Sequence, residues 1–295
     1  MRLVRFGKPG REHPGLMDNE GRLRDARPWI DDWRGDALDP GHLRALAGRD
    51  PAALPVLAED MRLGPCVGDA GKIVGVALNY HLHIQETGAK IPAEPVLFIK
   101  AGSSLAGAYD PIIMPQTGLK LDWEAELGVV IGRTVRNVTA ASALDHVAGY
   151  CLLDDVSERA FQTERGGQQH TKGKSADSFC PIGPWLLTTD AIADPQRIAL
   201  WTEVNGVRMQ DGNSRDMIFS VAALIAYISE FMSLHPGDII ATGTPDGVGK
   251  GMNPPRYLAI GDIVTIGGSG LGEQRHTVVR QSIDGCDTKA GRATS

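Results

Sequence analysis

The sequence lacks several features that mark large classes of protein. It has no surplus of positive charge, because 30 lysines and arginines stand against 36 acidic residues, a net charge of −6. Binding to nucleic acid needs a basic surface, so we expect no nucleic-acid partner. No apolar run approaches the roughly 20 residues of a membrane helix, and no basic, then apolar leader opens the chain. We therefore expect no membrane association and a cytoplasmic location.

Cysteine and aromatic residues are also scarce. The four cysteines form no C-x-x-C pair, and Cys151 and Cys180 lie in apolar stretches, so we expect buried free thiols. Aromatic residues make up only 5%, whereas glycine (36) and proline (18) are abundant. This composition favours tight turns and much β structure.

The pattern along the chain divides it into three segments. Residues 1–65 indicate a small α+β domain that contains a hairpin over 13–26. Residues 66–283 consist mainly of short apolar strands with few helices. Strand–long helix–strand alternation is rare, so a mixed, mainly antiparallel sheet fits better than a doubly wound parallel one. Residues 284–295 carry no apolar pattern and are expected to be a flexible tail.

Two helices are predicted in the large segment. The stretch NYHLHIQETG predicts a short helix, with Asn79 able to cap its start and Gly88 its end. A second helix is predicted in SVAALIAYISEFMSL, where one apolar stripe contains Val221, Leu224, Ile225, Ile228, Phe231 and Met232.

The stretch LDWEAELGVVIG, residues 121–132, places Glu124 and Glu126 two apart at the edge of an apolar run. Residues i and i+2 of a strand face the same side, so the two carboxylates would point together. They would repel each other, and a hard divalent cation such as Mg²⁺ would remove the conflict. Asp155, at the polar end of the predicted strand in HVAGYCLLDDVS, is the candidate third ligand. Its neighbour Asp154 would point to the opposite face.

Spacing alone favours a different interpretation, a solvated strand end plus a turn aspartate. The flanking residues argue against a loose exposed edge, because Trp123 and the run LGVVIG bracket the two glutamates. The metal site is therefore the prediction that we keep.

A base and several polar side chains accompany the acidic residues. His83 and Glu86 in HLHIQE are three apart, so on a helix the carboxylate can orient the imidazole as a base. Lys174, together with Arg159 and Gln162 from the segment after the acidic strand, would form a pocket for a carboxylate or enolate. The alternatives are a surface helical pair without a role and an amphipathic helix start with a surface arginine.

Two familiar enzyme motifs are excluded. The glycine-rich stretch GTPDGVGKG, residues 243–251, fails the P-loop pattern, because Thr244 and Gly251 stand where glycine and a hydroxyl residue are required. No G-x-S-x-G exists, so a serine hydrolase elbow is absent. The loop can still hold a carboxylate through its backbone N–H groups.

Eight stretches, taken in order, resemble the fumarylacetoacetate hydrolase family over about residues 70–280. They are GVALNYHLHIQETG, EPVLFIKAGSSLAG, KLDWEAELGVVIGRTVRNV, AGYCLLDDVSERAFQ, TKGKSADSFCPIGPWLLT, EVNGVRMQDGNSRDMIFSV, LHPGDIIATGTPDGVG and PPRYLAIGDIV. The opening residues also look like the N-terminal domain of one branch, the 2,4-diketo-3-deoxy-sugar-acid hydrolases of the L-rhamnonate or L-fuconate type, often labelled ureidoglycolate lyase.

The resemblance implies an α+β, mainly β fold, with a mixed β-roll core, a homodimer, and one Mg²⁺ or Mn²⁺ per subunit. It assigns the metal ligands to Glu124, Glu126 and Asp155, catalysis to His83, Glu86 and Lys174, and substrate contacts to Arg159, Gln162, Thr244 and Lys100. The stretch GGQQHTKGKS departs from the family's shorter loop, and its His170 receives no role.

The implied activity is hydrolysis of the C3–C4 bond of a 2,4-diketo acid, an acylpyruvate. For a diketo-deoxy-hexonate without its 6-hydroxyl, the products would be pyruvate and lactate. The same site could instead decarboxylate oxaloacetate or isomerise a 2-hydroxy-dienedioate. A non-catalytic metal-dependent binder of sugar acids is a further alternative, but it would leave His83 and Lys174 without a role.

Overall fold

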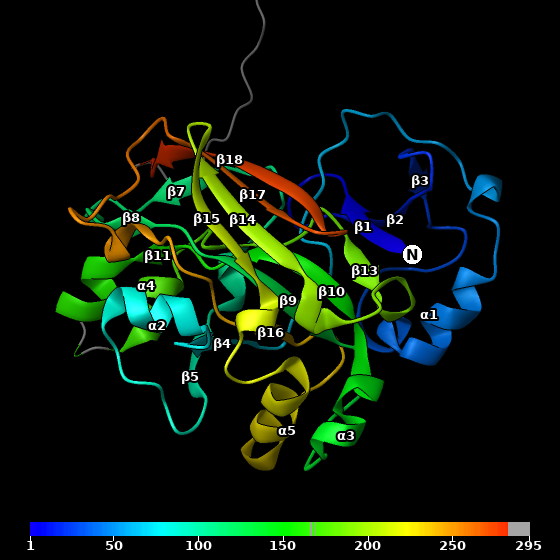
Figure 1. Cartoon of the computed structure of the whole chain (residues 1–295). Coiled ribbons are helices and arrows are strands. Elements are labelled where there is room, and N and C mark those ends of the chain that lie inside the picture. Colours follow the sequence, from blue (N-terminus) through cyan, green and yellow to red (C-terminus); the bar gives the residue numbers. More distant parts are fainter. Residues whose placement is uncertain (166, 168, 283–295) are drawn as a thin grey trace, which may run out of the picture.

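Two sheets form the body of the computed structural model, which describes all residues except 166, 168 and 283–295 (Figure 1). The predicted tail therefore lies outside the described residues. The larger sheet has nine strands in the order β3 (Leu23–Asp25), β2 (His13–Met17), β1 (Arg2–Phe6), β13 (Leu186–Thr188), β10 (Val147–Asp154), β9 (Ala125–Ile131), β16 (Ile239–Ala241), β4 (Ile73–Ala77) and β5 (Val96–Lys100). The smaller sheet has the order β15 (Val207–Asn213), β14 (Ala199–Val204), β17 (Ile263–Gly268), β18 (Gly272–Arg280) and β7 (Ile112–Met114).

Short elements complete the described chain. Two-stranded sheets pair β6 (Leu105–Ala106) with β12 (Cys180–Pro181) and β8 (Leu121–Asp122) with β11 (Ser157–Glu158). The α-helices are α1 (Pro40–Ala47), α2 (His81–Thr87), α3 (Ala140–Ala143), α4 (His170–Lys174) and α5 (Val221–Phe231). Within the described residues the strand pairs are mostly antiparallel, with parallel pairing of β4 with β16, β6 with β12 and β7 with β18. The predicted α+β, mainly β class with a mixed sheet is confirmed.

The central strands β9 and β10 are buried on both faces, which explains the apolar run in each of them. Val129 of β9 belongs to a core shared with strands of the smaller sheet, whereas Val130 belongs to a second core that includes residues of the N-terminal segment. Leu152 and Leu153 of β10 divide between the two cores in the same way. Because successive side chains of a strand alternate between faces, both faces must be apolar. The polar residues at the ends of these strands are therefore unusual, because they lie next to an apolar core.

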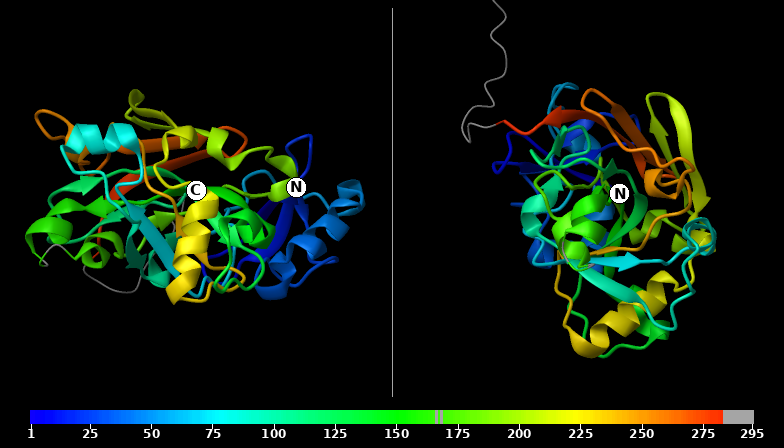
Figure 2. Two further views of the ribbon diagram at one scale, coloured as in Figure 1. Left: turned by 60° about the horizontal axis from the view of Figure 1, so that its bottom comes forward. Right: turned by 90° about the vertical axis from the view of Figure 1, so that its left-hand side faces the viewer.

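The N-terminal segment continues the large sheet. The predicted hairpin is present as β2 and β3, which pair antiparallel, and β1 pairs antiparallel with β13. Figures 1 and 2 show this blue segment at one end of the molecule and the helices α2 and α4 at the other. The boundary near residue 65 stays a prediction, because sharing a sheet does not decide whether the segment folds alone.

The two predicted helices differ from expectation in detail. α2 ends as predicted at Gly88, which has a left-handed φ of 64°, but its N-cap is Tyr80 rather than Asn79. The Asn79 side chain instead accepts from the Phe219 N–H at 2.8 Å and so holds the chain before α5. On α5 the predicted stripe is buried except at its end, where Phe231 is 55% exposed because it lies in the last turn.

Two remaining expectations concern cysteine and membranes. Cys151 and Cys180 are buried free thiols, as predicted, and Cys66 is a third. Among the described residues, none of the helices is long and apolar enough to cross a membrane.

Candidate metal centre and active site

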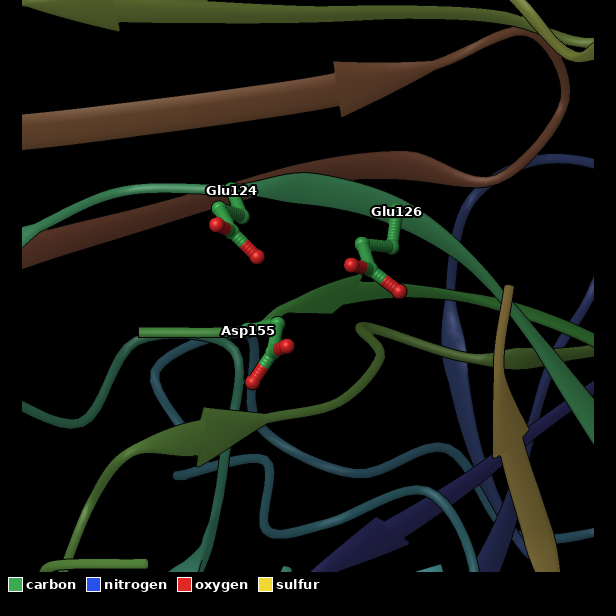
Figure 3. Close-up of side chains that lie close together, drawn as sticks. All are labelled: Glu124, Glu126 and Asp155. Atoms are coloured by element: carbon green, nitrogen blue, oxygen red, sulfur yellow. The ribbon is translucent and has the colours of Figure 1, made fainter. Parts of the chain in front are cut away.

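Three buried carboxylates meet at the end of the strand pair β9–β10 (Figure 3). Glu126 lies in β9, Glu124 lies just before that strand, and Asp155 directly follows β10. Each offers an oxygen, and these oxygens lie within 4.8 Å of one another. The Asp155 N–H donates to the Glu124 carbonyl at 2.9 Å, so the backbone itself fixes the two side chains beside each other. The predicted cluster is therefore present, although Glu124 is not itself part of the strand.

Asp154 lies outside the cluster, as strand alternation predicted. Its Oδ1 accepts from the Glu124 N–H at 3.0 Å. Burial raises the pKa of Asp154 to about 7. Asp154 thus holds the backbone of Glu124 and is not a member of the three-carboxylate group.

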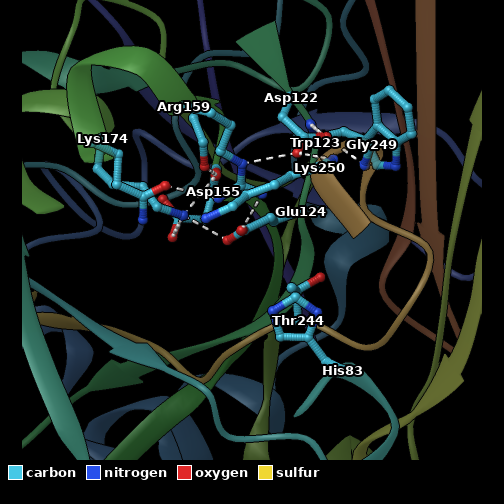
Figure 4. Close-up of polar contacts among 12 residues, drawn as sticks. His83, Asp122, Trp123, Glu124, Asp155, Arg159, Lys174, Thr244, Gly249 and Lys250 are labelled. Atoms are coloured by element: carbon cyan, nitrogen blue, oxygen red, sulfur yellow. Dashed lines mark hydrogen bonds and ion pairs between the residues drawn. The ribbon is translucent and has the colours of Figure 1, made fainter. Parts of the chain in front are cut away.

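Glu124 and Asp155 are paired with cations of the protein (Figure 4). The Lys174 Nζ donates to Glu124 Oε2 and to Asp155 Oδ2, both at 2.6 Å. Arg159 donates to Glu124 Oε1 at 2.6 Å, and Lys100 donates to Asp155 Oδ1 at 2.5 Å. Burial opposes ionisation of Glu124, but the charges of Lys174 and Arg159 outweigh it and lower its pKa.

Glu126 has a different environment. Among the described residues it has no ion pair, and its Oε2 accepts a single hydrogen bond, from the Gly243 N–H at 2.8 Å. Burial, then the negative charges of Asp155 and Glu124, raise the pKa of Glu126 well above its ordinary value. A divalent cation bound by the three carboxylates would supply the missing positive charge, and oxygen donors suit such an ion. The residues therefore fit a divalent metal, which Glu124, Glu126 and Asp155 would hold.

The carboxylates line a cavity of about 280 Å³, a size suited to a small organic acid. Polar and basic side chains from several elements share its wall: His83, Arg159, Gln162, His170, Lys174, Thr244 and Lys250. Most of the residues predicted from the sequence are thus brought to one place.

His83 and Glu86 form the predicted helical pair on α2. The His83 Nδ1 lies 3.2 Å from Glu86 Oε2, while Glu86 Oε1 accepts from the Gly247 N–H at 3.0 Å. His83 lines the cavity and Glu86 does not. The carboxylate, itself fixed by the loop, therefore orients the imidazole and leaves Nε2 free for a proton.

The predicted substrate contacts divide into two groups. Arg159, Gln162 and Thr244 line the cavity, and the Arg159 Nη1 donates to Gln162 Oε1 at 3.1 Å. Lys100 does not line it, and its buried Nζ donates to Asp155 Oδ1 and to the Lys174 carbonyl, both at 2.5 Å. This placement supports a role for Lys100 in holding Asp155 and does not support the predicted contact with substrate.

His170, which received no role from the sequence, lies on α4 at the cavity wall. Its ring packs against Phe98 with centroids 5.5 Å apart. Burial, then the charge of Lys174, lower the pKa of His170, which favours a neutral ring. Positions 166 and 168 of the unusual loop lie outside the described residues.

Asp122 is a residue of the site that was not predicted from the sequence. Its buried carboxylate accepts from the N–H groups of Trp123, Gly249 and Lys250 at 2.7–2.9 Å and from Arg159 Nε at 2.8 Å. The spacing D-x-E-x-E of Asp122, Glu124 and Glu126 was the available signal, since it continues the same period of two. Asp122 joins the cation Arg159 to the glycine-rich loop.

A comparison with protein families identifies the family to which the chain belongs. The family described as "Fumarylacetoacetate (FAA) hydrolase C-terminal" matches residues 72–279. The chain belongs to the fumarylacetoacetate hydrolase family. The narrower sugar-acid branch suggested by the sequence stays a prediction.

Relatives of the whole chain are also found. A Burkholderia lata protein described as a "putative hydrolase" is 52% identical over 279 residues, 94% of this chain and 99% of that protein. The crystal structure of maleylpyruvate hydrolase from Sphingobium sp. SYK-6, in complex with manganese(II) ion and pyruvate, is 30% identical with a TM-score of 0.78, covering 96% of this chain and 100% of that one. A probable 2-hydroxyhepta-2,4-diene-1,7-dioate isomerase from Mycobacterium abscessus is 31% identical with the same TM-score and coverage. The chain is thus similar to both hydrolases and isomerases.

Proposed function

We propose that this protein is a metal-dependent enzyme that hydrolyses the C3–C4 bond of an acylpyruvate. The observation that carries the proposal is one shared cavity, lined both by the three carboxylates and by His83, whose ring is oriented by Glu86. Carboxylates alone would suffice for binding a metal and a keto acid. A buried, oriented imidazole beside them supports activation of water.

The similarity to solved structures supports the same class of chemistry. The Sphingobium relative is named for hydrolysis of an acylpyruvate, and its structure holds manganese and pyruvate. Pyruvate is the product that C3–C4 cleavage of any acylpyruvate would release. We therefore propose Mg²⁺ or Mn²⁺ as the cofactor and a small 2-keto acid as the substrate.

His83 is the proposed base. Its Nε2 takes a proton from water as the water oxygen attacks the 4-keto carbon of the substrate. The C3–C4 bond then breaks, and its electron pair passes into the enolate of pyruvate. The proton held by His83 returns to C3, which yields pyruvate and a carboxylic acid and consumes one water. Glu86 stabilises the imidazolium that forms between these two proton transfers.

Negative charge develops on the departing enolate, and positive charges beside it lower the barrier. When bound, the metal would act as a Lewis acid toward the 2-keto acid end of the substrate. Lys174 lines the same cavity and holds two of the metal ligands through its ammonium group. Substituting Lys174 would therefore disturb both the ligands and the charge available to the enolate.

The test is a panel of 2,4-diketo acids and oxaloacetate, with pyruvate detection in the presence of Mg²⁺ or Mn²⁺. General-base catalysis typically contributes 10²–10⁴-fold, so we expect His83→Ala to lose at least about a hundredfold in kcat on acylpyruvates. Full retained activity of that variant would contradict the role of His83. A diketo-deoxy sugar acid belongs in the panel, because it tests the branch predicted from the sequence.

One alternative keeps the site and changes the reaction. The similarity to a dienedioate isomerase favours proton transfer on a 2-hydroxy-dienedioate, and oxaloacetate decarboxylation would use the same enolate. Neither reaction needs an attacking water. Product analysis therefore separates them from hydrolysis, and turnover of any of these compounds excludes a non-catalytic binder.

A further inference from the structure

Ala125 stands between the carboxylates Glu124 and Glu126, and among the described residues no strand pairs with its backbone on one side of β9. The N–H and C=O groups of Ala125 and Leu127 face the same side, because backbone groups alternate along a strand. On that side lies β16, and the last backbone bond of this pairing runs from the Thr242 N–H to the Leu127 carbonyl at 3.3 Å. Ala125 lies beyond it and is fully buried, so its backbone groups need another partner.

The side chain of Gln210, from β15 of the smaller sheet, takes the place of the missing strand. Its Oε1 accepts from the Ala125 N–H at 3.0 Å, and its Nε2 donates to Thr244 Oγ1 at 2.8 Å. The Thr244 hydroxyl in turn donates to the Ala125 carbonyl at 3.0 Å. These three hydrogen bonds close a ring through the N–H and C=O of one residue, and linked hydrogen bonds strengthen one another.

Two more contacts fix the orientation of the Gln210 amide. Its Oε1 also accepts from Thr202 Oγ1 at 2.7 Å, and its Nε2 also donates to the Pro245 carbonyl at 2.9 Å. Exchanging the oxygen and nitrogen would place the amide nitrogen against the Ala125 N–H and the oxygen against the Pro245 carbonyl. Gln210 is fully buried, so it forms a rigid link between the smaller sheet, β9 and the loop after β16.

The held peptide carries two of the three carboxylates. Glu124 and Glu126 are the chain neighbours of Ala125, so movement of its backbone would change the spacing of their side chains. Their charges and that of Asp155 repel one another when no cation lies between them, which favours separation of the side chains. The ring around Ala125 opposes that movement. The Gly243 N–H, which precedes Thr244 in the same loop, also holds Glu126 Oε2 at 2.8 Å.

We propose that Gln210 is a positioning residue of the metal centre, which acts through the backbone of Ala125 to keep Glu124 and Glu126 at the spacing that a divalent cation requires. The inference rests on the metal site of the proposed function and not on which bond of the substrate is cleaved. A glutamine with a purely structural role would stabilise the fold without changing the affinity for metal.

Gln274 of β18 is the matched control. It is also fully buried, and its Nε2 donates to the Leu152 and Gly183 carbonyls at 2.9 and 3.0 Å. It thus also joins the smaller sheet to a central strand of the larger one, β10. Among the described residues, none that directly precedes or follows a carboxylate of the cluster has a hydrogen bond with the Gln274 side chain.

The test compares Gln210→Met with Gln274→Met, which remove the same amide from two buried positions. Mn²⁺ affinity is measured by titration calorimetry at a temperature where circular dichroism shows each variant folded. We expect both variants to have a lower thermal midpoint, because both lose buried hydrogen bonds. Only Gln210→Met should weaken Mn²⁺ binding, by about tenfold or more, the usual scale for loss of a group that supports metal ligands.

A second pair of variants tests the ring if Gln210→Met does not fold. Thr244→Val keeps the shape of the side chain but removes the hydroxyl, so it should also weaken Mn²⁺ binding. Thr244→Ser keeps the hydroxyl and should restore the wild-type affinity. Unchanged affinity in Gln210→Met or Thr244→Val, or an equal loss in Gln274→Met, would overturn the inference.

The proposed reaction and this inference fail in different ways. A wild-type protein that cleaves no acylpyruvate would refute the reaction, while the Mn²⁺ affinities of the variants would still decide the role of Gln210. A wild-type protein that binds no divalent metal would overturn both the inference and the proposed cofactor.

Discussion

Glu126 is the residue whose chemistry depends most on a metal. Within the described chain, its neighbours Glu124 and Asp155 have cationic partners, whereas Glu126 receives one backbone hydrogen bond. Like charges this close are stable only with a cation or a proton between them. The three carboxylates are chemically similar, so their different charge environments arise from the contacts that the lysines and the arginine make with only two of them.

Replacing Glu126 with glutamine should strongly weaken metal binding while the fold persists. We expect the affinity for Mn²⁺, measured by titration calorimetry, to fall at least about a hundredfold, since a charged ligand is lost from a site of three. Asp154→Asn is the matched control, because Asp154 is also buried but only accepts the Glu124 N–H, and an amide oxygen preserves that bond. Undiminished affinity in Glu126→Gln would refute the ligand assignment.

At the scale of elements, the site depends on the contact between α2 and the loop that contains Gly247 and Gly251. Gly247 donates to Glu86, and a Cβ placed on Gly251 would lie 2.3 Å from the Glu86 carboxyl carbon. The loop therefore sets the position of the carboxylate that orients His83. A glycine at 251 is needed for this close approach.

Gly251→Ala should displace the Glu86 carboxylate and disorient His83. We expect kcat to fall about tenfold or more, because a misplaced base loses part of its 10²–10⁴-fold contribution. The thermal midpoint should change little, since the displaced group is the end of a flexible side chain. Gly48→Ala, where the new Cβ would meet only the Ala45 carbonyl at 3.6 Å, is the control. Unchanged kcat in Gly251→Ala would show that this contact is not required.

The sequence predicted the elements well where local pattern decides, as in the apolar strands β9 and β10 and the hairpin of β2 and β3. The alternation of Asp154 and Asp155 likewise predicted which of the two belongs to the carboxylate cluster. It could not predict the hydrogen bonds of Asp122 to Gly249, 127 residues away, because long-range contacts leave no periodic trace. Lys100, to which the resemblance assigned a substrate contact, does not line the cavity, because resemblance gives a residue's identity without its direction.

At the scale of the whole molecule, the described fold leaves an open strand at one end of the large sheet. β5 pairs with β4 on one side, and its Val96 and Ile99 are 41% and 38% exposed. Exposed apolar edge strands are templates for association with another chain. We propose that the homodimer predicted from the sequence forms over this edge.

Sedimentation equilibrium should give the mass of two chains. The double substitution Val96→Lys/Ile99→Lys should produce a monomer with unchanged secondary structure, because paired lysines oppose association at an edge. Val207→Lys, on the edge strand β15 of the smaller sheet, is the control and should remain dimeric. A monomeric wild-type protein would contradict the predicted dimer. A double variant that remains dimeric would show that the interface does not lie at this edge.

The most direct measurement for the central proposal is the product stoichiometry of an acylpyruvate incubated with the protein, with and without divalent metal. We expect one pyruvate and one carboxylic acid per substrate consumed, no release after chelation, and recovery when Mn²⁺ or Mg²⁺ is restored. Turnover that persists in the metal-free protein, or substrate loss without equimolar pyruvate and acid, would contradict it.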